Sequence, residues 1–77
     1  MIEVKINLRE IRKQKGLTQK ELAKMSGVSV AYISMLELQK RSPTIFVLIN
    51  LAKVLNVKIG DLVAVAEDGF RSTYKYF

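Results

Sequence analysis

Residues 16–38 read GLTQKELAKMSGVSVAYISMLEL and contain the most informative spacing in the sequence. The small residue Ala23 is followed by Gly27 after three residues, and Gly27 by the branched apolar residue Ile33 after five more. Two helices that meet at a steep angle need a small side chain where they approach, a glycine at the turn and an apolar side chain that seals the contact. The spacing therefore predicts a helix-turn-helix unit over residues 18–38.

The start of the first helix of this unit is marked by Thr18 and Glu21. At this spacing the hydroxyl and the carboxylate each satisfy a free backbone N–H group, which is the arrangement called a capping box. The inward side of this helix is expected to consist of Leu22, Ala23 and Met25.

The second helix of the unit follows Gly27, where the lack of a Cβ lets the chain turn sharply. Ser29 can cap this helix, which should run to about Leu38. Ile33 and Leu36 are expected to face the core. The outward positions are then Val30, Ala31, Ser34 and Met35.

The flanking sequence predicts three further helices. One follows an Asn7 cap and runs to Lys15 before Gly16, with its inward side formed by Leu8, Ile11 and Arg12. Another follows a Thr44 cap, runs to about Leu55 and is apolar on more than one side, so it should lie at the centre of the core. The last covers residues 59–66.

Both ends of the sequence contain strand-forming residues. Residues 2–6 alternate apolar and charged side chains, which predicts a short strand. Residues 70–77 form an aromatic tail that follows a turn at residues 67–69. Pairing of residues 2–6 with residues 73–77 is therefore expected, either within one chain or across a dimer.

The sequence resembles the lambda repressor-like helix-turn-helix family, which includes the phage repressor and Cro proteins and many short bacterial regulators. The resemblance implies an all-α, compact five-helix domain of the Cro/C1 type, here expected to span residues 1–77 with short terminal β-strands added. It rests on LREIR at 8–12, GLTQKELA at 16–23, GVS at 27–29, ISMLE at 33–37, Pro43, and LAKVLNV at 51–57.

The same resemblance implies binding to double-stranded DNA. Members of the family place the residue corresponding to Gln19 against a phosphate, and they read base edges from the start of the second helix of the unit. The DNA-contacting set implied for this chain is Gln19, Ser29, Val30, Ala31, Tyr32, Ser34 and Met35. Tyr32 has an equally good interpretation as a cover for the helix pair.

The reading positions depart from the usual family pattern. Where Gln, Arg or Asn is common and could form two bonds to a purine, this chain has Val30, Ala31 and Met35. These side chains can contact thymine methyl groups, while Ser34 or Tyr32 supplies one hydrogen bond. We therefore expect either modest sequence discrimination or a contribution from DNA shape.

The resemblance also implies an ion pair between Arg12 and Glu37, which would join the first helix to the end of the third. The alternative is two unrelated surface charges. If the pair forms, it fixes geometry more than it adds net stability.

The composition is strongly basic, with a net charge of +6 and a pI near 9.8, which favours a polyanionic partner. Positive side chains near helix ends and in the loop that would flank the groove are predicted to contact phosphates, although ordinary solvation explains each one alone. They are Lys13, Lys15, Lys20, Lys40 and Arg41.

Several classes of function are disfavoured. The sequence contains no Cys and no His, so no metal and no cofactor is expected. The carboxylates are scattered, which argues against an enzyme. The N-terminus lacks the apolar stretch of a signal peptide, and the apolar residues 44–57 are interrupted and too short to cross a bilayer. A cytoplasmic protein with no membrane association is expected.

The sequence therefore predicts a DNA-binding transcriptional regulator, a repressor that acts as a homodimer on a palindromic operator. The dimer is expected to use the fifth helix and the aromatic tail, although the tail could equally pack on its own core. The residues concerned are Leu62, Val63, Val65, Phe70, Tyr74, Tyr76 and Phe77. The alternative is an antitoxin-like or co-regulator module whose main partner is another protein.

Overall fold

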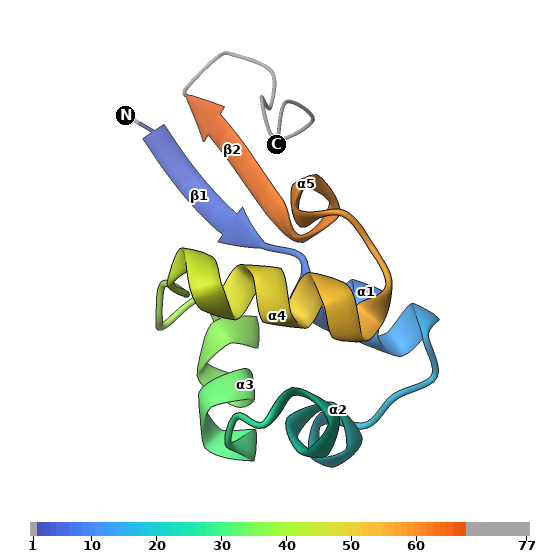
Figure 1. The fold of residues 1–77 in the computed structure, drawn as a ribbon. Coiled ribbons are helices and arrows are strands. Elements are labelled where there is room, and N and C mark those ends of the chain that lie inside the picture. Colours follow the sequence, from blue (N-terminus) through green and yellow to red (C-terminus); the bar gives the residue numbers. More distant parts are fainter. Residues whose placement is uncertain (1, 68–77) are drawn as a thin grey trace.

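The computed structural model describes residues 2–67 of the 77-residue chain. A two-stranded sheet stands at one end of a helical bundle, and α2 lies at the opposite end (Figure 1). None of the helices in this range is long and apolar enough to cross a membrane. The elements in chain order are β1 Ile2–Ile6, α1 Leu8–Gln14, α2 Gln19–Ser26, α3 Val30–Glu37, α4 Ile45–Leu55, α5 Ile59–Leu62 and β2 Val63–Glu67.

The predicted helix starts are confirmed at three of four positions. The Thr18 hydroxyl accepts a bond of 3.0 Å from the backbone N–H of Glu21, and the Glu21 carboxylate accepts one of 2.9 Å from the backbone N–H of Thr18. Ser29 and Thr44 cap α3 and α4 through the hydroxyl alone, which accepts from the backbone N–H of Tyr32 and of Val47. Asn7 stands at the start of α1, but its side chain forms no capping bond.

The core lies where the helices meet the base of the sheet. The predicted inward positions of α1 and α3 are confirmed, because Leu8, Ile33 and Leu36 are fully buried. The prediction for Met25 is wrong, since this side chain is 53% exposed. Ser26 is buried in the same turn of α2, and its hydroxyl donates to the Leu22 carbonyl at 2.7 Å.

Only part of α4 occupies the central position that the sequence predicts. Its second half contributes the buried residues Leu51, Ala52 and Leu55. Its first half leaves large apolar side chains in solvent, with Phe46 79% and Ile45 55% exposed. Helix α4 therefore has more apolar side chains than this core buries.

The predicted fifth helix is wrong beyond Leu62. Helix α5 covers only Ile59–Leu62, and the chain then continues as β2. The sequence VAVAE of β2 alternates β-branched valines with small residues, which suits a pleated strand, and each strand residue gains a cross-strand partner. Strand propensity and the pairing with β1 therefore both favour the strand over the predicted continuation of the helix.

Strand β2 is antiparallel to β1, with Ile6 opposite Val63 and Ile2 opposite Glu67. The expected N-terminal strand is therefore confirmed, whereas its partner is residues 63–67 and not residues 73–77. The backbone N–H of Asn7 also donates to the Leu62 carbonyl at 2.8 Å, which fixes the start of α1 to the end of α5. Residues 70–77, including the predicted aromatic tail, lie outside the described residues.

Candidate nucleic-acid interface

The turn between α2 and α3 has the conformation that the glycine spacing predicts. Gly27 adopts φ 76° and ψ 14°, and its N–H donates to the Ala23 carbonyl at 2.9 Å. A Cβ at this position would meet no atom within 4 Å, so the glycine is needed for its left-handed backbone and not for space. Helices α2 and α3 consequently run in different directions, with α2 seen almost end-on and α3 seen from the side (Figure 1).

Helix α3 presents an apolar surface to solvent. Val30 is 41% and Met35 is 38% exposed, and Ala31 is exposed between them in sequence, while Ser34 is partly buried. Tyr32 is partly buried and packs against the core, which supports its interpretation as a cover for the helix pair. The outward side predicted for α3 is thus largely accessible.

The first turn of α3 is oriented by Ser29, whose hydroxyl accepts a bond of 3.0 Å from the backbone N–H of Tyr32. The hydroxyl thereby satisfies one of the backbone N–H groups that a helix N-terminus leaves without a helical partner. Ser29 itself is exposed, as are Val30 and Ala31. The start of α3 is therefore both capped and open to a ligand.

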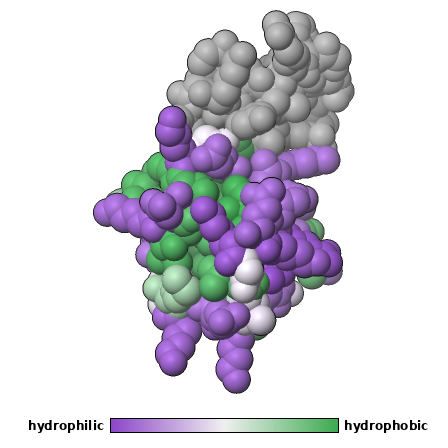
Figure 2. Space-filling view, turned by 90° about the vertical axis from the view of Figure 1, so that its right-hand side faces the viewer, coloured by the Kyte–Doolittle hydropathy of each residue, from purple (hydrophilic) through white to green (hydrophobic). Residues whose placement is uncertain are grey.

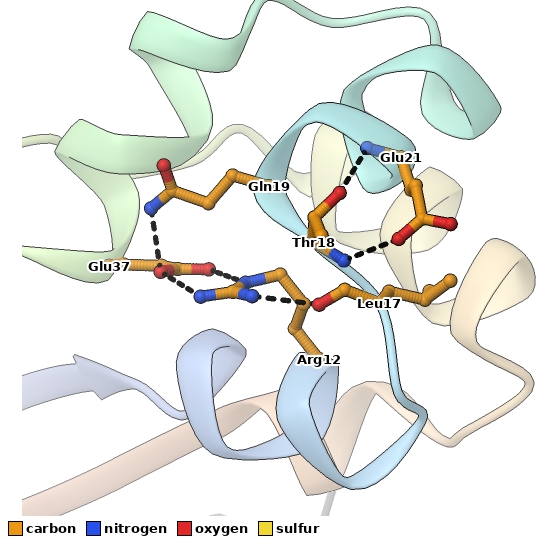
Figure 3. A network of polar contacts seen from close by, with 6 residues as sticks. All are labelled: Arg12, Leu17, Thr18, Gln19, Glu21 and Glu37. Carbon is orange, nitrogen blue, oxygen red and sulfur yellow. Dashed lines mark hydrogen bonds and ion pairs between the residues drawn. The ribbon is translucent and has the colours of Figure 1, made fainter.

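The predicted ion pair between Arg12 and Glu37 is present and buried (Figure 3). The Arg12 Nε donates to Glu37 Oε2 at 2.6 Å, and Nη2 donates to Oε1 at 3.1 Å. The remaining guanidinium nitrogen, Nη1, donates to the Leu17 carbonyl at 2.8 Å. Only 10% of the Arg12 side chain and 4% of the Glu37 side chain are exposed. Arg12 therefore links α1, the α1–α2 loop and α3.

The carboxylate of Glu37 also holds Gln19, the first residue of α2. Gln19 Nε2 donates to Glu37 Oε1 at 2.9 Å, as Figure 3 shows. An amide nitrogen carries two hydrogens, so the second can still be offered to an acceptor outside the protein. These groups border a cavity of about 230 Å³ that is lined by Arg9, Arg12, Gln19, Ser34, Glu37 and Leu38.

The charge of Glu37 is maintained by its neighbours. Burial raises the pKa of the Glu37 carboxyl, but the hydrogen bonds from Arg12 and Gln19 and the positive charges of Arg12 and Arg9 outweigh this effect. The pKa of Glu37 consequently lies below its usual value. The hydrogen bond to Glu37 raises the pKa of Arg12 above its usual value despite burial. Both groups stay ionised at neutral pH.

The predicted phosphate-contacting cations all lie on the surface. Those before and within α2 are Lys13, Lys15 and Lys20, and those after α3 are Lys40 and Arg41. In the chain four of them therefore flank the helix pair that the turn at Gly27 joins, and Lys20 lies in its first turn. No cluster of three His, Cys, Asp or Glu side chains that could hold a metal is found within residues 2–67.

Two side-chain contacts that hold the unit in place are not among the sequence predictions. Asn50 Nδ2 donates to the Ser26 carbonyl at 2.6 Å, which ties the end of α2 to α4. The carboxamide of Gln39 bonds to both backbone polar groups of Ile6. A polar residue inside the apolar α4 was a usable signal for Asn50, whereas no local pattern indicates the partner of Gln39.

The sequence of residues 8–62, which spans α1 to α5, matches the Helix-turn-helix family HTH_3. The chain belongs to this family. The resemblance to the lambda repressor-like proteins is thereby confirmed. Strands β1 and β2 both lie outside the matched residues.

Similar proteins share most of the length of this HTH_3 protein. The HTH-type transcriptional regulator y4dJ of Sinorhizobium fredii is 40% identical over 62 residues, which are 80% of each chain. Control protein C.SmaI of Serratia marcescens is 39% identical over 57 residues, which are 74% of this chain and 68% of that protein. The restriction-modification controller protein C.AhdI from Aeromonas hydrophila matches in structure with a TM-score of 0.65 and 35% identity, covering 68% of this chain and 79% of that one.

Proposed function

We propose that this HTH_3 protein is a transcriptional regulator that binds double-stranded DNA with the start of α3 in the major groove. The observation that carries the proposal is the exposed, Ser29-capped first turn of α3, which the left-handed turn at Gly27 directs away from the core. A major groove about 12 Å wide admits one α-helix. The names of the similar regulators and controller proteins support the same function.

Phosphate contacts are proposed for the start of α2 and for the exposed cations. A helix N-terminus carries free N–H groups and a partial positive charge, which suit a phosphate oxygen. Gln19 stands at this position with one amide hydrogen bonded to Glu37. Lys13, Lys15, Lys20, Lys40 and Arg41 are exposed around the same helix pair in sequence and would position the duplex without reading its sequence.

We also propose that two copies bind one palindromic operator. One small module buries limited surface on DNA, and two half-sites about one helical turn apart multiply the affinity. The predicted use of Leu62 and Val63 for this dimer is not supported, because both side chains are buried in the core of their own chain. Val65 is in β2, and the aromatic tail lies outside the described residues.

The outer side of α4 offers a better surface for a second copy. Ile45 and Ile49 are exposed one turn apart, next to Phe46. Ile49 also lines a groove on the surface, together with Ala52, Lys53, Asn56, Val57 and Ile59. Figure 2 views the molecule from the right-hand side of Figure 1, where α4 ends, and shows hydrophobic surface framed by hydrophilic side chains on that side. Apolar surface of this kind marks association sites on small proteins.

The proposed regulation is repression in the cytoplasm, by competition for sites that overlap the operator. No enzymatic step forms part of the proposal. Among the described carboxylates, Glu21 is used in the cap of α2 and Glu37 in the ion pair with Arg12. Both therefore have structural partners.

A second candidate is a module whose main partner is another protein. The observation that favours it is the apolar outward side of α3, which continues from Val30 and Met35 to Leu38, a residue 58% exposed. Binding to DNA through phosphates weakens steeply as salt rises, whereas an apolar protein complex does not. The salt dependence of the tightest complex therefore distinguishes the two candidates.

Selection of bound sequences from a random duplex pool tests the proposed function. We expect enrichment of a palindrome, with affinity that falls steeply with salt, and a dimer by sedimentation at the concentrations at which the duplex binds. Phe46→Glu should weaken that dimer, while Lys5→Glu on β1 should leave it intact. A pool that returns no enriched sequence would reject sequence-specific binding and favour the protein-partner candidate.

A further inference from the structure

The side chains that α3 exposes lack the groups that recognise purines. The helix reads VAYISMLE and contains no Arg, Lys, Asn or Gln, which are the side chains that form two bonds to guanine or adenine. Glu37 is occupied by Arg12 and Gln19, and Tyr32 packs against the core. Ser34 is left as a donor or acceptor of single hydrogen bonds.

The exposed apolar side chains of α3 form a continuous stripe. Ala31, Met35 and Leu38 follow one another at helical spacing of four and three residues, and Val30 lies beside Ala31 at the N-terminal end. Val30, Met35 and Leu38 are 41%, 38% and 58% exposed. The stripe therefore runs along the side of α3 that the proposed function places in the groove.

The major-groove edge of DNA offers one apolar group, the 5-methyl of thymine. The same methyl group is present at the same place in 5-methylcytosine. Uracil has the hydrogen-bonding groups of thymine without the methyl group, and cytosine has those of 5-methylcytosine without the methyl group. A methyl group that is buried against an aliphatic side chain is removed from water, while a polar base edge in the same place would lose its hydrogen bonds.

We propose that this protein reads its DNA site through the 5-methyl groups of pyrimidines, which contact Val30, Ala31 and Met35 of the apolar stripe. The inference rests on the proposed function, because it assumes that α3 enters the major groove. It assigns sequence selectivity to apolar contacts, and it leaves to Gln19 and the surface cations the sequence-independent share of the affinity.

The size of the effect follows from the area buried. Burial of one methyl-sized group is worth about 0.8 kcal/mol, which is about fourfold in affinity. Two contacted methyl groups in each half-site would then give about 15-fold, and both half-sites together would exceed 100-fold. Since these contacts release no counterions, the ratio of affinities with and without the methyl groups should stay constant as salt rises.

The test uses the full chain and the duplex enriched from the random pool. Each thymine is replaced in turn by uracil, and the dissociation constant is measured by fluorescence anisotropy of a labelled duplex. We expect a loss of about fourfold at thymines within the half-sites and no loss at thymines outside them. Where the site contains a contacted cytosine, 5-methylcytosine should strengthen binding by a similar factor, which separates the methyl group itself from other features of thymine.

Variants connect the effect to the stripe. For each duplex position, the thymine-to-uracil ratio is the affinity for the duplex with thymine divided by the affinity for the duplex with uracil. In Val30→Ala and Met35→Ala this ratio should fall towards one at one position, while binding to the uracil duplex changes little. Met25→Ala is the matched control, because Met25 is exposed to a similar degree but belongs to α2. Its thymine-to-uracil ratio should equal that of the unmodified protein.

The outcomes separate this inference from the proposed function. An enriched duplex that binds equally well with thymine and with uracil at every position overturns methyl readout and leaves DNA binding standing. An enriched site without thymine or methylated cytosine in its half-sites has the same meaning. A protein that enriches no duplex at all overturns both.

Discussion

The carboxamide of Gln39 forms a pair of hydrogen bonds with the backbone of Ile6. Gln39 Oε1 accepts from the Ile6 N–H at 2.9 Å, and Gln39 Nε2 donates to the Ile6 carbonyl at 2.9 Å. The side chain thus occupies the edge of β1 in the manner of a neighbouring strand. It connects the end of the proposed recognition helix to the sheet.

This contact is maintained at the cost of an unfavourable backbone. Gln39 has φ 61°, a left-handed conformation that residues with a Cβ seldom adopt. We expect Gln39→Ala to lower the free energy of unfolding by about 1–3 kcal/mol, because two hydrogen bonds are lost and the backbone strain remains. Gln39→Gly should cost less, since glycine relieves that strain. Urea unfolding checks both, and a Gln39→Ala variant as stable as the parent would contradict the account.

The ion pair of Arg12 and Glu37 is predicted to matter more when broken than when replaced. Arg12→Met should destabilise the fold by about 3–5 kcal/mol, because it leaves the Glu37 carboxylate buried without its main partner. The double replacement Arg12→Met with Glu37→Met should recover much of that loss. Thermal and urea unfolding of both variants measure this. A double variant less stable than Arg12→Met would contradict it.

The lowered pKa of Glu37 predicts an acid-sensitive contribution to stability. A carboxyl whose pKa is lower in the folded than in the unfolded state stabilises the fold above its unfolded pKa of about 4.3. That contribution disappears as the pH falls through the lower folded value. The difference in unfolding free energy between the parent and Glu37→Gln should therefore be largest at neutral pH and shrink below about pH 4. A difference that is constant from pH 7 to pH 2 would refute the assignment.

The turn at Gly27 is predicted to need a left-handed backbone and nothing more. Gly27→Ala should destabilise the protein by about 1–2 kcal/mol, although the added methyl group has free space. Gly27→Asn should cost less, because asparagine tolerates this conformation. Unfolding curves of the two variants compare the costs. A loss for Gly27→Asn as large as that for Gly27→Ala would contradict the account.

Features that depend on a few neighbouring residues could be predicted from the sequence. The capping box of Thr18 and Glu21 and the turn at Gly27 each involve residues within a few positions of one another, so their chemistry is visible in a short window. The buried pair of Arg12 and Glu37 was accessible only through the resemblance, because its members are 25 residues apart.

The remaining features depend on tertiary partners. The partner of Val63–Glu67 in the sheet is β1, which is about 60 residues away in the sequence, so no short window of sequence shows this pairing. Met25 and Phe46 are exposed because no other described element covers their sides of α2 and α4. Helical periodicity alone does not reveal which side is covered. The bond from Gln19 to Glu37 likewise required the structure, since sequence reasoning assigned Gln19 to phosphate alone.

The central claim is that the outward side of α3 binds duplex DNA. The affinity of the Ala31→Glu variant for the enriched duplex tests this claim most directly. Ala31 is exposed in the first turn of α3, where a glutamate is compatible with the helix. Lys5→Gln changes the net charge by the same amount on β1, at the far end of the molecule from α2. We predict at least a tenfold loss of affinity for Ala31→Glu with an unchanged melting temperature, and little change for Lys5→Gln. Equal affinities for the two variants would show that α3 does not face the DNA.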